Sequence, residues 1–351
     1  MKPPAVVVGV GWVAGLAAIR SLGRAGVRVL AVDDRDGALG FRSRYGEARL
    51  APNRIEQRDA FVRFLADLGE GVAFPTHDDD LETIARHRDE LALTCPFPAW
   101  DVLGRIQDKR RQLAVAAEAG IAVPRTADRP TDELGFPVLV KPSDPTSFRR
   151  RFGVKAFRCA DRGELERRFE DARLHAPLVQ EWIPGGDDAL YTAGTYVAHD
   201  GEALGVFTGR KLLQTPREIG TARVAEARWL PALAEDALRL LRGLGFHGIA
   251  QVELKRDPRD GRFKLIEVNP RLWEWHGLAS ACGVDLPRIA YLDSLGERPR
   301  PVRMRGDGKR WAITLARGSR PAFQRLPYVD AMWASDDPRP ALVHWARVVR
   351  P

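Results

Sequence analysis

The segment from Arg262 to Arg271 constrains this chain more than any other stretch. It reads R-F-K-L-I-E-V-N-P-R, a short apolar strand with charge confined to particular positions. A second strand of this kind, Ile249 to Leu254, lies upstream, and the intervening K-R-D-P-R-D-G is a strong hairpin signal. The pattern therefore predicts a tight antiparallel pair of strands.

This hairpin would bring three oxygen-bearing side chains together. Glu267 and Asn269 are two residues apart, so they project from the same face of their strand, and Glu253 lies on the strand upstream. Two carboxylates and one amide oxygen form a hard ligand set that suits magnesium bound together with substrate phosphates. Pro270 ends the strand, and Arg271 would place a cation beside the metal. An ordinary hairpin with solvated acids is the alternative interpretation, because an isolated E-x-N is a weak signal.

Composition places the chain among soluble globular enzymes. Its 351 residues are enough for two or three packed units, and 44% are hydrophobic and 29% charged. We find no apolar run long enough to span a bilayer, and the opening M-K-P-P-A-V-V-V-G predicts a buried strand rather than a signal peptide. The cysteines, Cys95, Cys159 and Cys282, are odd in number and far apart, so they indicate neither a disulfide framework nor a zinc site. We expect a cytoplasmic protein.

The net charge of +8 favours an anionic partner. The basic residues are scattered, and no basic stripe interleaved with aromatic residues stands out. We therefore expect an anionic small molecule rather than nucleic acid.

A βαβ pattern opens the chain. The apolar run at 5–10 leads into Gly9, Gly11 and Ala14, which form G-x-G-x-x-A before a helix at 16–25. The next strand ends at Asp33, where a ribose-binding acid would lie. The glycines fit both a dinucleotide site and a tight turn without a ligand.

Thr76-His77-Asp78-Asp79-Asp80 follow a further strand at 71–75. We expect Asp80 to cap a helix at 81–91 and His77 or Asp78 to contact a ligand. A metal site at His77 is the less favoured interpretation. Residues 1–98 are thus predicted to form one α/β unit.

The middle of the chain carries further basic residues at places typical of ligand binding. Lys109 lies in a predicted helix at 106–120, and the strand at 136–141 delivers Lys141 at its end. The stretch from Ser143 to Lys155 holds four cations, a composition suited to a mobile flap over phosphates; a solvated basic loop is the alternative. From residue 299 onward the chain has few strong periodicities, and we expect a cap or tail.

Five motifs occur in an order and spacing that we recognise. They are D-K at 108–109, V-L-V-K-P at 138–142, V-Q-E-W-I-P-G-G at 179–186, Q-V-E-L at 251–254 and I-E-V-N-P-R at 266–271. The chain resembles the ATP-grasp superfamily from about residue 101 to 295, and in particular its carboxylate–amine ligase and carbamoyl-phosphate-synthase-like members. The resemblance implies a mixture of α/β and α+β structure, in which a Rossmann-like pre-ATP-grasp domain precedes a two-lobed ATP-grasp fold. The implied parts are the pre-ATP-grasp domain at 1–98, a small lobe at 99–178, a large lobe at 179–298 and a C-terminal cap or tail at 299–351.

The resemblance also assigns roles to individual residues. Residues expected to bind ATP are Lys109, Lys141, Lys155, Glu181, Trp182, Ile183 and Asp188. The expected ligands of Mg²⁺ or Mn²⁺ are Glu253, Glu267 and Asn269. Arg271 would stabilise the phosphorylated intermediate, and Lys211 would act beside the γ-phosphate.

The activity implied is ATP-dependent joining of a small carboxylate to a small amine through an acyl phosphate, with release of ADP. Dimers are common among such ligases. Alternatives are a reaction that stops at phosphorylation, a biotin-type carboxylation, and, from another class, a dinucleotide-binding oxidoreductase or sensor built on Gly9 and Gly11.

Two departures from the superfamily pattern stand out. The phosphate loop at 143–155 is rich in arginine and holds only Gly153, so its arginines would bind either phosphate or an anionic substrate. After N-P-R the chain reads L-W-E-W-H, and we expect Trp273, Trp275 and His276 to line the acceptor pocket. Core packing of these rings is the alternative.

Overall fold

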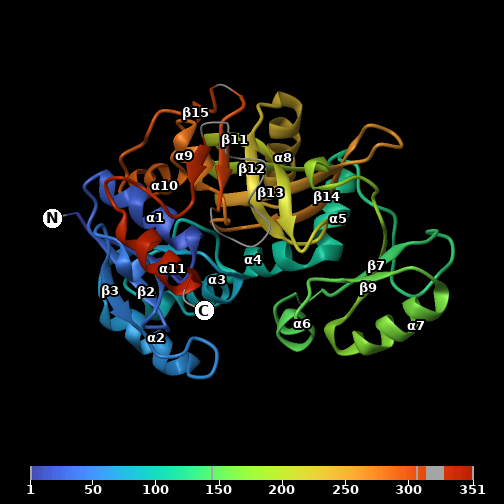
Figure 1. The fold of residues 1–351 in the computed structure, drawn as a ribbon, viewed down its shortest axis with the longest axis horizontal. Helices are drawn as coiled ribbons and strands as arrows, with labels where there is room; N and C mark the ends of the chain where they lie inside the picture. Colours follow the sequence, from blue (N-terminus) through green and yellow to red (C-terminus); the bar gives the residue numbers. More distant parts are fainter. Residues whose placement is uncertain (1, 144, 306, 314–327, 350–351) are drawn as a thin grey trace.

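The computed structural model describes residues 2–143, 145–305, 307–313 and 328–349. These residues form sheets of five, eight and four strands. The first two sheets make up the body of the molecule, and the four-stranded sheet with helix α7 projects to one side of it (Figure 1).

The five-stranded sheet is parallel, with the order β3-β2-β1-β4-β5. Its central strand is buried along its whole length, as the apolar run predicts. Alternate residues of that strand face two cores: Ala5 and Val7 pack with helix α1, and Val6 and Val8 pack with α2 and α3. The elements of this unit are β1 (Ala5–Val8), α1 (Val13–Arg24), β2 (Val29–Asp33), η1 (Leu39–Arg42), β3 (Glu47–Leu50), α2 (Arg58–Asp67), β4 (Gly71–Pro75), α3 (Asp78–Arg86), η2 (Arg88–Glu90) and β5 (Leu93–Thr94).

Side chains of this unit fill the surroundings of the glycine turn. The Arg35 guanidinium lies where a Cβ at Gly11 would stand, and Arg35 donates from its backbone and side chain to Asp33 Oδ1. In one interpretation of the sequence, Asp33 would bind the ribose of a dinucleotide. In the structure it binds Arg35 instead. Asp80 does not cap α3, contrary to our expectation. It is fully buried and pairs with Arg54 at 2.8 Å.

The four-stranded sheet has the order β6-β9-β7-β8 and its own core. Strands β7 and β9 pair antiparallel, so Lys141 lies opposite Leu178. This core, which includes Val138, Val140 and Phe148, is separate from the two that fill the body. The elements are β6 (Thr126–Ala127), β7 (Val138–Lys141), α6 (Pro145–Phe152), β8 (Phe157–Cys159), α7 (Arg162–Asp171), η3 (Arg173–His175) and β9 (Leu178–Glu181).

The eight-stranded sheet contains the predicted hairpin. Strand β13 pairs antiparallel with β14, and Glu253 lies directly opposite Glu267. The path is β14-β13-β10-β11-β12-β16-β17, and β15 joins it through β11. Its strands are β10 (Leu190–Val197), β11 (Ala203–Thr215), β12 (Thr221–Ala227), β13 (Gly248–Arg256), β14 (Phe263–Asn269), β15 (Val302–Arg303), β16 (Arg310–Ala312) and β17 (Tyr328–Asp330). The accompanying helices are α4 (Trp100–Gln107), α5 (Lys109–Glu118), η4 (Asp187–Ala189), α8 (Pro231–Gly243), α9 (Gly277–Ala281), α10 (Leu286–Ser294) and α11 (Arg339–Val349).

Two local expectations were wrong. Residues 145–152, expected in a mobile loop, form helix α6, because Phe148 and Phe152 fall one turn apart and pack with ring centroids 4.8 Å apart. The single helix expected at 106–120 is two helices. They separate at Asp108, whose carboxylate caps α5 by accepting from the backbone amides of Arg110 and Arg111.

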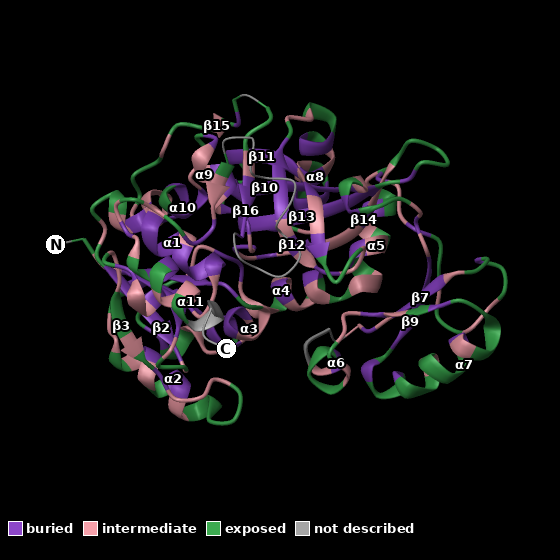
Figure 2. Cartoon of the chain, viewed as in Figure 1, coloured by how far each residue is buried: buried purple, intermediate pink, exposed green. Residues whose placement is uncertain are grey.

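The C-terminal segment is part of the body rather than a tail laid on it. Strands β16 and β17 extend the large sheet, and α11 lies against the turn at Leu39–Arg42 (Figure 1). Buried residues concentrate in the strands of the large sheet and in α1, whereas α2 and α7 present exposed outer turns (Figure 2). Among the described helices, we find none with the length and apolar character needed to cross a membrane.

Candidate active site

One cavity of about 520 Å³ collects most of the predicted site residues. Its wall combines residues of the small sheet, of the large sheet and of the loops that follow strands of the five-stranded sheet, so it lies where the small sheet meets the body. Predicted residues that line it are Lys109, Lys141, Lys155, Glu181, Trp182, Ile183, Lys211, Glu253, Glu267, Asn269 and Arg271. The exception is Asp188, which is exposed and is not part of the cavity wall.

The hairpin presents its acids to this cavity. Lys211 Nζ lies 2.8 Å from Glu253 Oε1, and Lys109 Nζ lies 3.0 Å from Glu267 Oε1. Asn269 donates from Nδ2 to Gln251 Oε1. Within the described residues, Oε2 of each glutamate and Oδ1 of Asn269 have no hydrogen-bond or ion-pair partner. Three hard oxygens are therefore available to a divalent cation.

The number of protein ligands fits a metal shared with a substrate. Within the described ranges, no three His, Cys, Asp or Glu side chains are placed to hold an ion by themselves. Two carboxylates and an amide leave coordination positions for phosphate oxygens and water, which is how proteins commonly bind Mg²⁺. The donor set therefore fits magnesium carried in with a phosphorylated ligand.

Lysines balance the charge of these acids. Burial would raise the pKa of Glu267, but the positive charges of Lys109 and Lys155 outweigh it and hold that pKa well below its usual range. Burial and the neighbouring charge of Lys109 lower the pKa of Lys141 to about 7. The site thus holds a surplus of poorly solvated positive charge, which favours a polyanion.

Arg271 is held in place from the N-terminal unit. Its Nε and Nη2 donate to the two carboxylate oxygens of Asp78, at 2.6 and 2.8 Å. Asp78 is the first residue of α3, at the carboxyl end of β4. A ligand contact by His77 or Asp78 was expected, and both residues line the cavity. Asp78 orients Arg271 through this bidentate pair.

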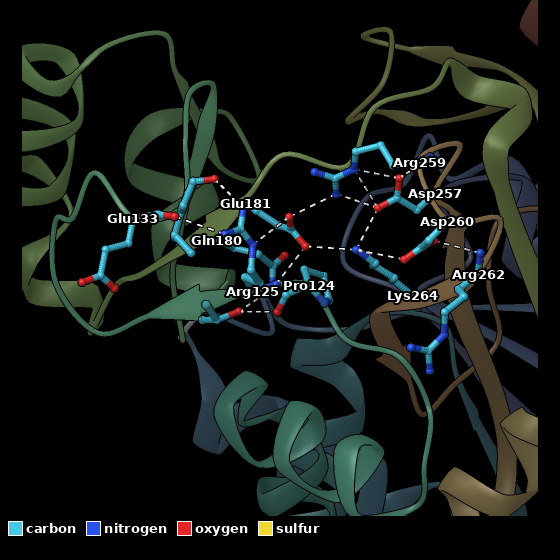
Figure 3. Close-up of polar contacts among 12 residues, drawn as sticks. Pro124, Arg125, Glu133, Gln180, Glu181, Asp257, Arg259, Asp260, Arg262 and Lys264 are labelled. Atoms are coloured by element: carbon cyan, nitrogen blue, oxygen red, sulfur yellow. Dashed lines mark hydrogen bonds and ion pairs between the residues drawn. The ribbon is translucent and has the colours of Figure 1, made fainter.

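Glu181 connects the small sheet to the body (Figure 3). It is 3% exposed and accepts hydrogen bonds from the backbone and side chain of Arg125, which precedes β6. On its other side it pairs with Lys264 at 3.2 Å and Arg259 at 3.1 Å, both from the β13–β14 hairpin. Glu181, at the end of β9, therefore links the small sheet to the body through ion pairs, although the two have separate cores.

Comparisons with known proteins agree with this geometry. Residues 218–297 match the family model described as carbamoyl-phosphate synthase L chain, ATP binding domain. The D-aspartate ligase of Enterococcus faecium (strain Aus0004) is 26% identical over 273 residues, which cover 72% of this chain and 63% of that protein. The chain thus spans less than two thirds of the length of the curated relatives it matches.

Solved structures share most of the fold. The biotin carboxylase domain of Hydrogenobacter thermophilus 2-oxoglutarate carboxylase, solved with MgADP and bicarbonate, has a TM-score of 0.69 at 19% identity, covering 88% of this chain and 74% of that one. The N5-carboxyaminoimidazole ribonucleotide synthetase of Thermus thermophilus has a TM-score of 0.63 at 17% identity, covering 87% and 81%. In sequence and in fold, the chain is thus similar to the ATP-grasp superfamily.

At the end of the cavity formed by Trp182, two cations that the motifs did not indicate lie beside its ring. Lys255 Nζ lies 4.8 Å from the centre of the Trp182 ring, and the Arg158 guanidinium lies 4.7 Å from it. Lys255 continues the alternation of Gln251 and Glu253 on one face of β13, so strand periodicity could have identified it. Arg158 comes from β8, and no local signal places it here.

The opposite end of the cavity is built partly from the N-terminal unit. Trp12, Arg35 and Arg54 line it, and none was predicted because their approach depends on how the units pack. Of the rings expected at the acceptor pocket, Trp273 and Trp275 do line the cavity, although they are only 2% and 1% exposed. They serve mainly as core.

His276 is the ring that does not fit our expectation. It lies outside the cavity wall, and its Nε2 contacts the carbonyl of Ala14 at 2.9 Å. Burial lowers the pKa of His276 to about 4, so the ring is neutral near pH 7 and packs as core.

Proposed function

We propose that this ATP-grasp protein is a Mg-ATP-dependent ligase that joins a carboxylate to an amine through an acyl phosphate. The observation that carries the proposal is the facing pair Glu253 and Glu267 on one cavity wall, each with a lysine on one oxygen and the other oxygen unpartnered among the described residues. Such a set neutralises a triphosphate and leaves ligands for its metal.

The residues around the pair have separate tasks in this proposal. Lys109, Lys141 and Lys155 neutralise the phosphates, and Lys211 lies at the γ-phosphate. Trp182 and Ile183 hold the adenine base. Glu181, which precedes them, links the small sheet to the β13–β14 hairpin. Asp188, which is exposed, is not included, although the resemblance placed it among the residues expected to bind ATP.

The proposed reaction has two steps. A carboxylate oxygen attacks the γ-phosphorus, the bond to the β-γ bridging oxygen breaks, and ADP leaves. An amine nitrogen then attacks the acyl carbon, and inorganic phosphate leaves. Glu253, Glu267 and Asn269 would hold Mg²⁺, which neutralises charge on the phosphate oxygens when bound. Arg271, oriented by Asp78, faces the negative charge that develops in both steps.

We also propose the division of the chain that the resemblance implies. Residues 1–98 serve as the pre-ATP-grasp domain, 99–178 as the small lobe, 179–298 as the large lobe and 299–351 as the C-terminal part. Strand β9 (Leu178–Glu181) pairs within the small sheet, so the crossing between lobes falls after Glu181 rather than at 178. A homodimer in the cytoplasm completes the proposal.

Release of ADP and phosphate from Mg-ATP tests the activity. The acids are pooled small carboxylates without an amino group, tested with and without pooled amines, and D-aspartate, which carries both groups, is tested separately because one relative is a D-aspartate ligase. We expect release that requires both an acid and an amine. Glu267→Ala should reduce it by more than about 100-fold, because a metal ligand is lost.

Glu47→Ala is the matched control, since Glu47 is an exposed glutamate on β3. It should retain full activity. Release stimulated by bicarbonate instead of an acid and an amine would point to carboxylation. ATP cleavage that no acid stimulates would contradict the ligase proposal.

A further inference from the structure

One cavity carboxylate has no role in the proposed mechanism. Glu274 lies between Trp273 and Trp275 in the segment that joins β14 to α9. Both tryptophans are buried in the core, and Glu274 is intermediate in exposure and lines the cavity. Packing of the two rings therefore fixes the backbone that presents this acid to the ligand.

The two oxygens of Glu274 are in different environments. Oε1 accepts the indole N–H of Trp12 at 2.7 Å and a guanidinium N–H of Arg223 at 3.4 Å. Oε2 has no partner among the residues that the structure describes, and it is not sealed from the cavity. The first oxygen anchors the carboxylate, and the second is available to a ligand.

Most of the other cavity acids already hold cations of the protein. These pairs are Asp78 with Arg271, Glu181 with Lys264, Glu253 with Lys211 and Glu267 with Lys109. Asp79 also lines the cavity, but the cations that act on it are Arg150 and Arg54. Those that act on Glu274 include Lys155, which neutralises the phosphates in the proposed function, and Lys211, which lies at the γ-phosphate. Glu274 is thus an acid of the cavity wall, without a role in the mechanism above, that lies close enough to interact with both lysines.

The environment of Glu274 favours a cation as its ligand. Burial raises the pKa of Glu274, against the opposing effects of the Trp12 hydrogen bond and the Arg223 charge. A poorly solvated carboxylate is stabilised by a hydrogen bond from a charged donor. It also accepts a proton more readily than an exposed carboxylate. An amine acceptor arrives in water mainly as an ammonium ion, which supplies both.

We propose that Glu274 binds the ammonium form of the acceptor amine and removes one of its protons before the attack. This inference rests on the ligase function proposed above. The proton moves from the ammonium nitrogen to Oε2, and the freed lone pair forms the N–C bond to the acyl carbon. The C–O bond to phosphate breaks, the second proton leaves with phosphate, and Glu274 returns its proton to water. The acceptor class is therefore a protonated amine.

Hydroxylamine separates this role from a structural one. It is uncharged near neutral pH and attacks acyl phosphates directly, giving a hydroxamate that is measured by colour. Wild type and Glu274→Gln are compared with Mg-ATP and with pooled small carboxylates that carry no amino group. The nucleophile is either hydroxylamine or one of a set of protonated amines: L-lysine, ethanolamine, putrescine and methylamine. We expect hydroxamate formation to stay within about twofold of wild type and amide formation to fall about 100-fold.

Two further variants sharpen the test. Glu226→Gln is the matched control, because Glu226 is a buried glutamate on β12 that pairs with Arg210 and Arg310 outside the cavity. It should leave both products unchanged. Trp12→Phe keeps an aromatic ring but removes the donor to Oε1, and we expect it to raise the KM for the amine severalfold while the hydroxamate rate is retained.

Each other outcome overturns the inference in a distinct way. Equal loss of both products in Glu274→Gln would assign Glu274 a structural role. Unchanged amide formation in Glu274→Gln would show that Glu274 takes no part in the reaction of the amine. A wild type that accepts hydroxylamine but none of the protonated amines would exclude the acceptor class. A wild type that forms neither product would remove the ligase proposal itself.

Discussion

Lys141 illustrates how a single residue couples fold to chemistry. It is the last residue of β7, so the apolar strand that precedes it fixes its position. Burial and the charge of Lys109 lower the pKa of Lys141 to about 7, far below that of a solvated lysine. In the proposed function, a bound phosphate would recover the energy that this desolvation costs, since the anion stabilises the charged form of Lys141.

ATP affinity should therefore depend on pH through Lys141. In the free protein a growing fraction of this side chain is neutral above pH 7, whereas bound triphosphate keeps it charged. Binding then takes up a proton, and the Kd for Mg-ATP should rise up to about tenfold per pH unit above about pH 7. Calorimetric titrations over this range, in buffers of different ionisation enthalpy, measure the uptake.

Lys141→Arg is the control, because a guanidinium stays charged over this whole range. Its Kd should vary much less with pH than that of the wild type. The same pH slope in both proteins would mean that Lys141 does not titrate on binding.

At the scale of elements, helix α3 and strand β14 meet at a single ion pair. Asp78 opens α3, and Arg271 follows β14 by two residues, so neither element alone fixes the guanidinium. The pair couples the N-terminal unit to the large sheet at the cavity wall. An arginine that must face a developing charge is more effective when it is already oriented.

Asp78→Asn should lower kcat about tenfold, which is about 1.4 kcal/mol of transition-state stabilisation, and leave the KM for ATP within about twofold. The amide keeps the size of the side chain but weakens both contacts to Arg271. Steady-state kinetics of ADP release measure the change. Glu82→Gln, on the same helix and paired only with Arg86 among the described residues, should have no effect. A comparable loss in both variants would attribute the effect to the helix rather than to Arg271.

The elements that the sequence predicts correctly are those whose signal is local. The hairpin at Glu253 and Glu267 has a turn motif and strand alternation within twenty residues, and the structure pairs it as expected. Helix α6 was missed because basic composition masked the spacing of Phe148 and Phe152. Trp12 could not be predicted, since its place in the cavity depends on docking two units that are distant in sequence.

At the scale of the whole molecule, the C-terminal segment locks the N-terminal unit. Asp337 is buried and accepts from Arg20 Nε at 2.9 Å, from Ser43 Oγ at 2.8 Å and from the backbone of Arg44 at 3.0 Å. Arg20 also donates to the carbonyl of Met332. Further along, His344 packs edge-on against Trp12, with ring centroids 5.6 Å apart.

Asp337→Asn should destabilise the protein by about 3 kcal/mol, because it leaves the buried Arg20 with a neutral partner. Asp336→Asn is the matched comparison, since Asp336 pairs with Arg24 in a half-exposed position and its replacement should cost less than about 1 kcal/mol. Free energies of unfolding from urea titration measure both. An equal loss of unfolding free energy in Asp337→Asn and Asp336→Asn would show that burial of the Arg20–Asp337 pair does not increase its contribution to stability.

The contact between Arg20 and Asp337 also means that the surface around Arg20 is completed late in the synthesis of the chain. The residues that bury Arg20 are added to the growing chain more than three hundred positions after it. On a growing chain that ends before residue 332, Arg20 and Ser43 have not yet met their C-terminal partners, and Trp12 has not yet met His344. The N-terminal unit can collapse early, but its final surface forms only after translation has passed Asp337. Termination of synthesis before Asp337 would therefore yield a fragment in which Arg20, Ser43 and Trp12, which lines the cavity, lack their C-terminal partners.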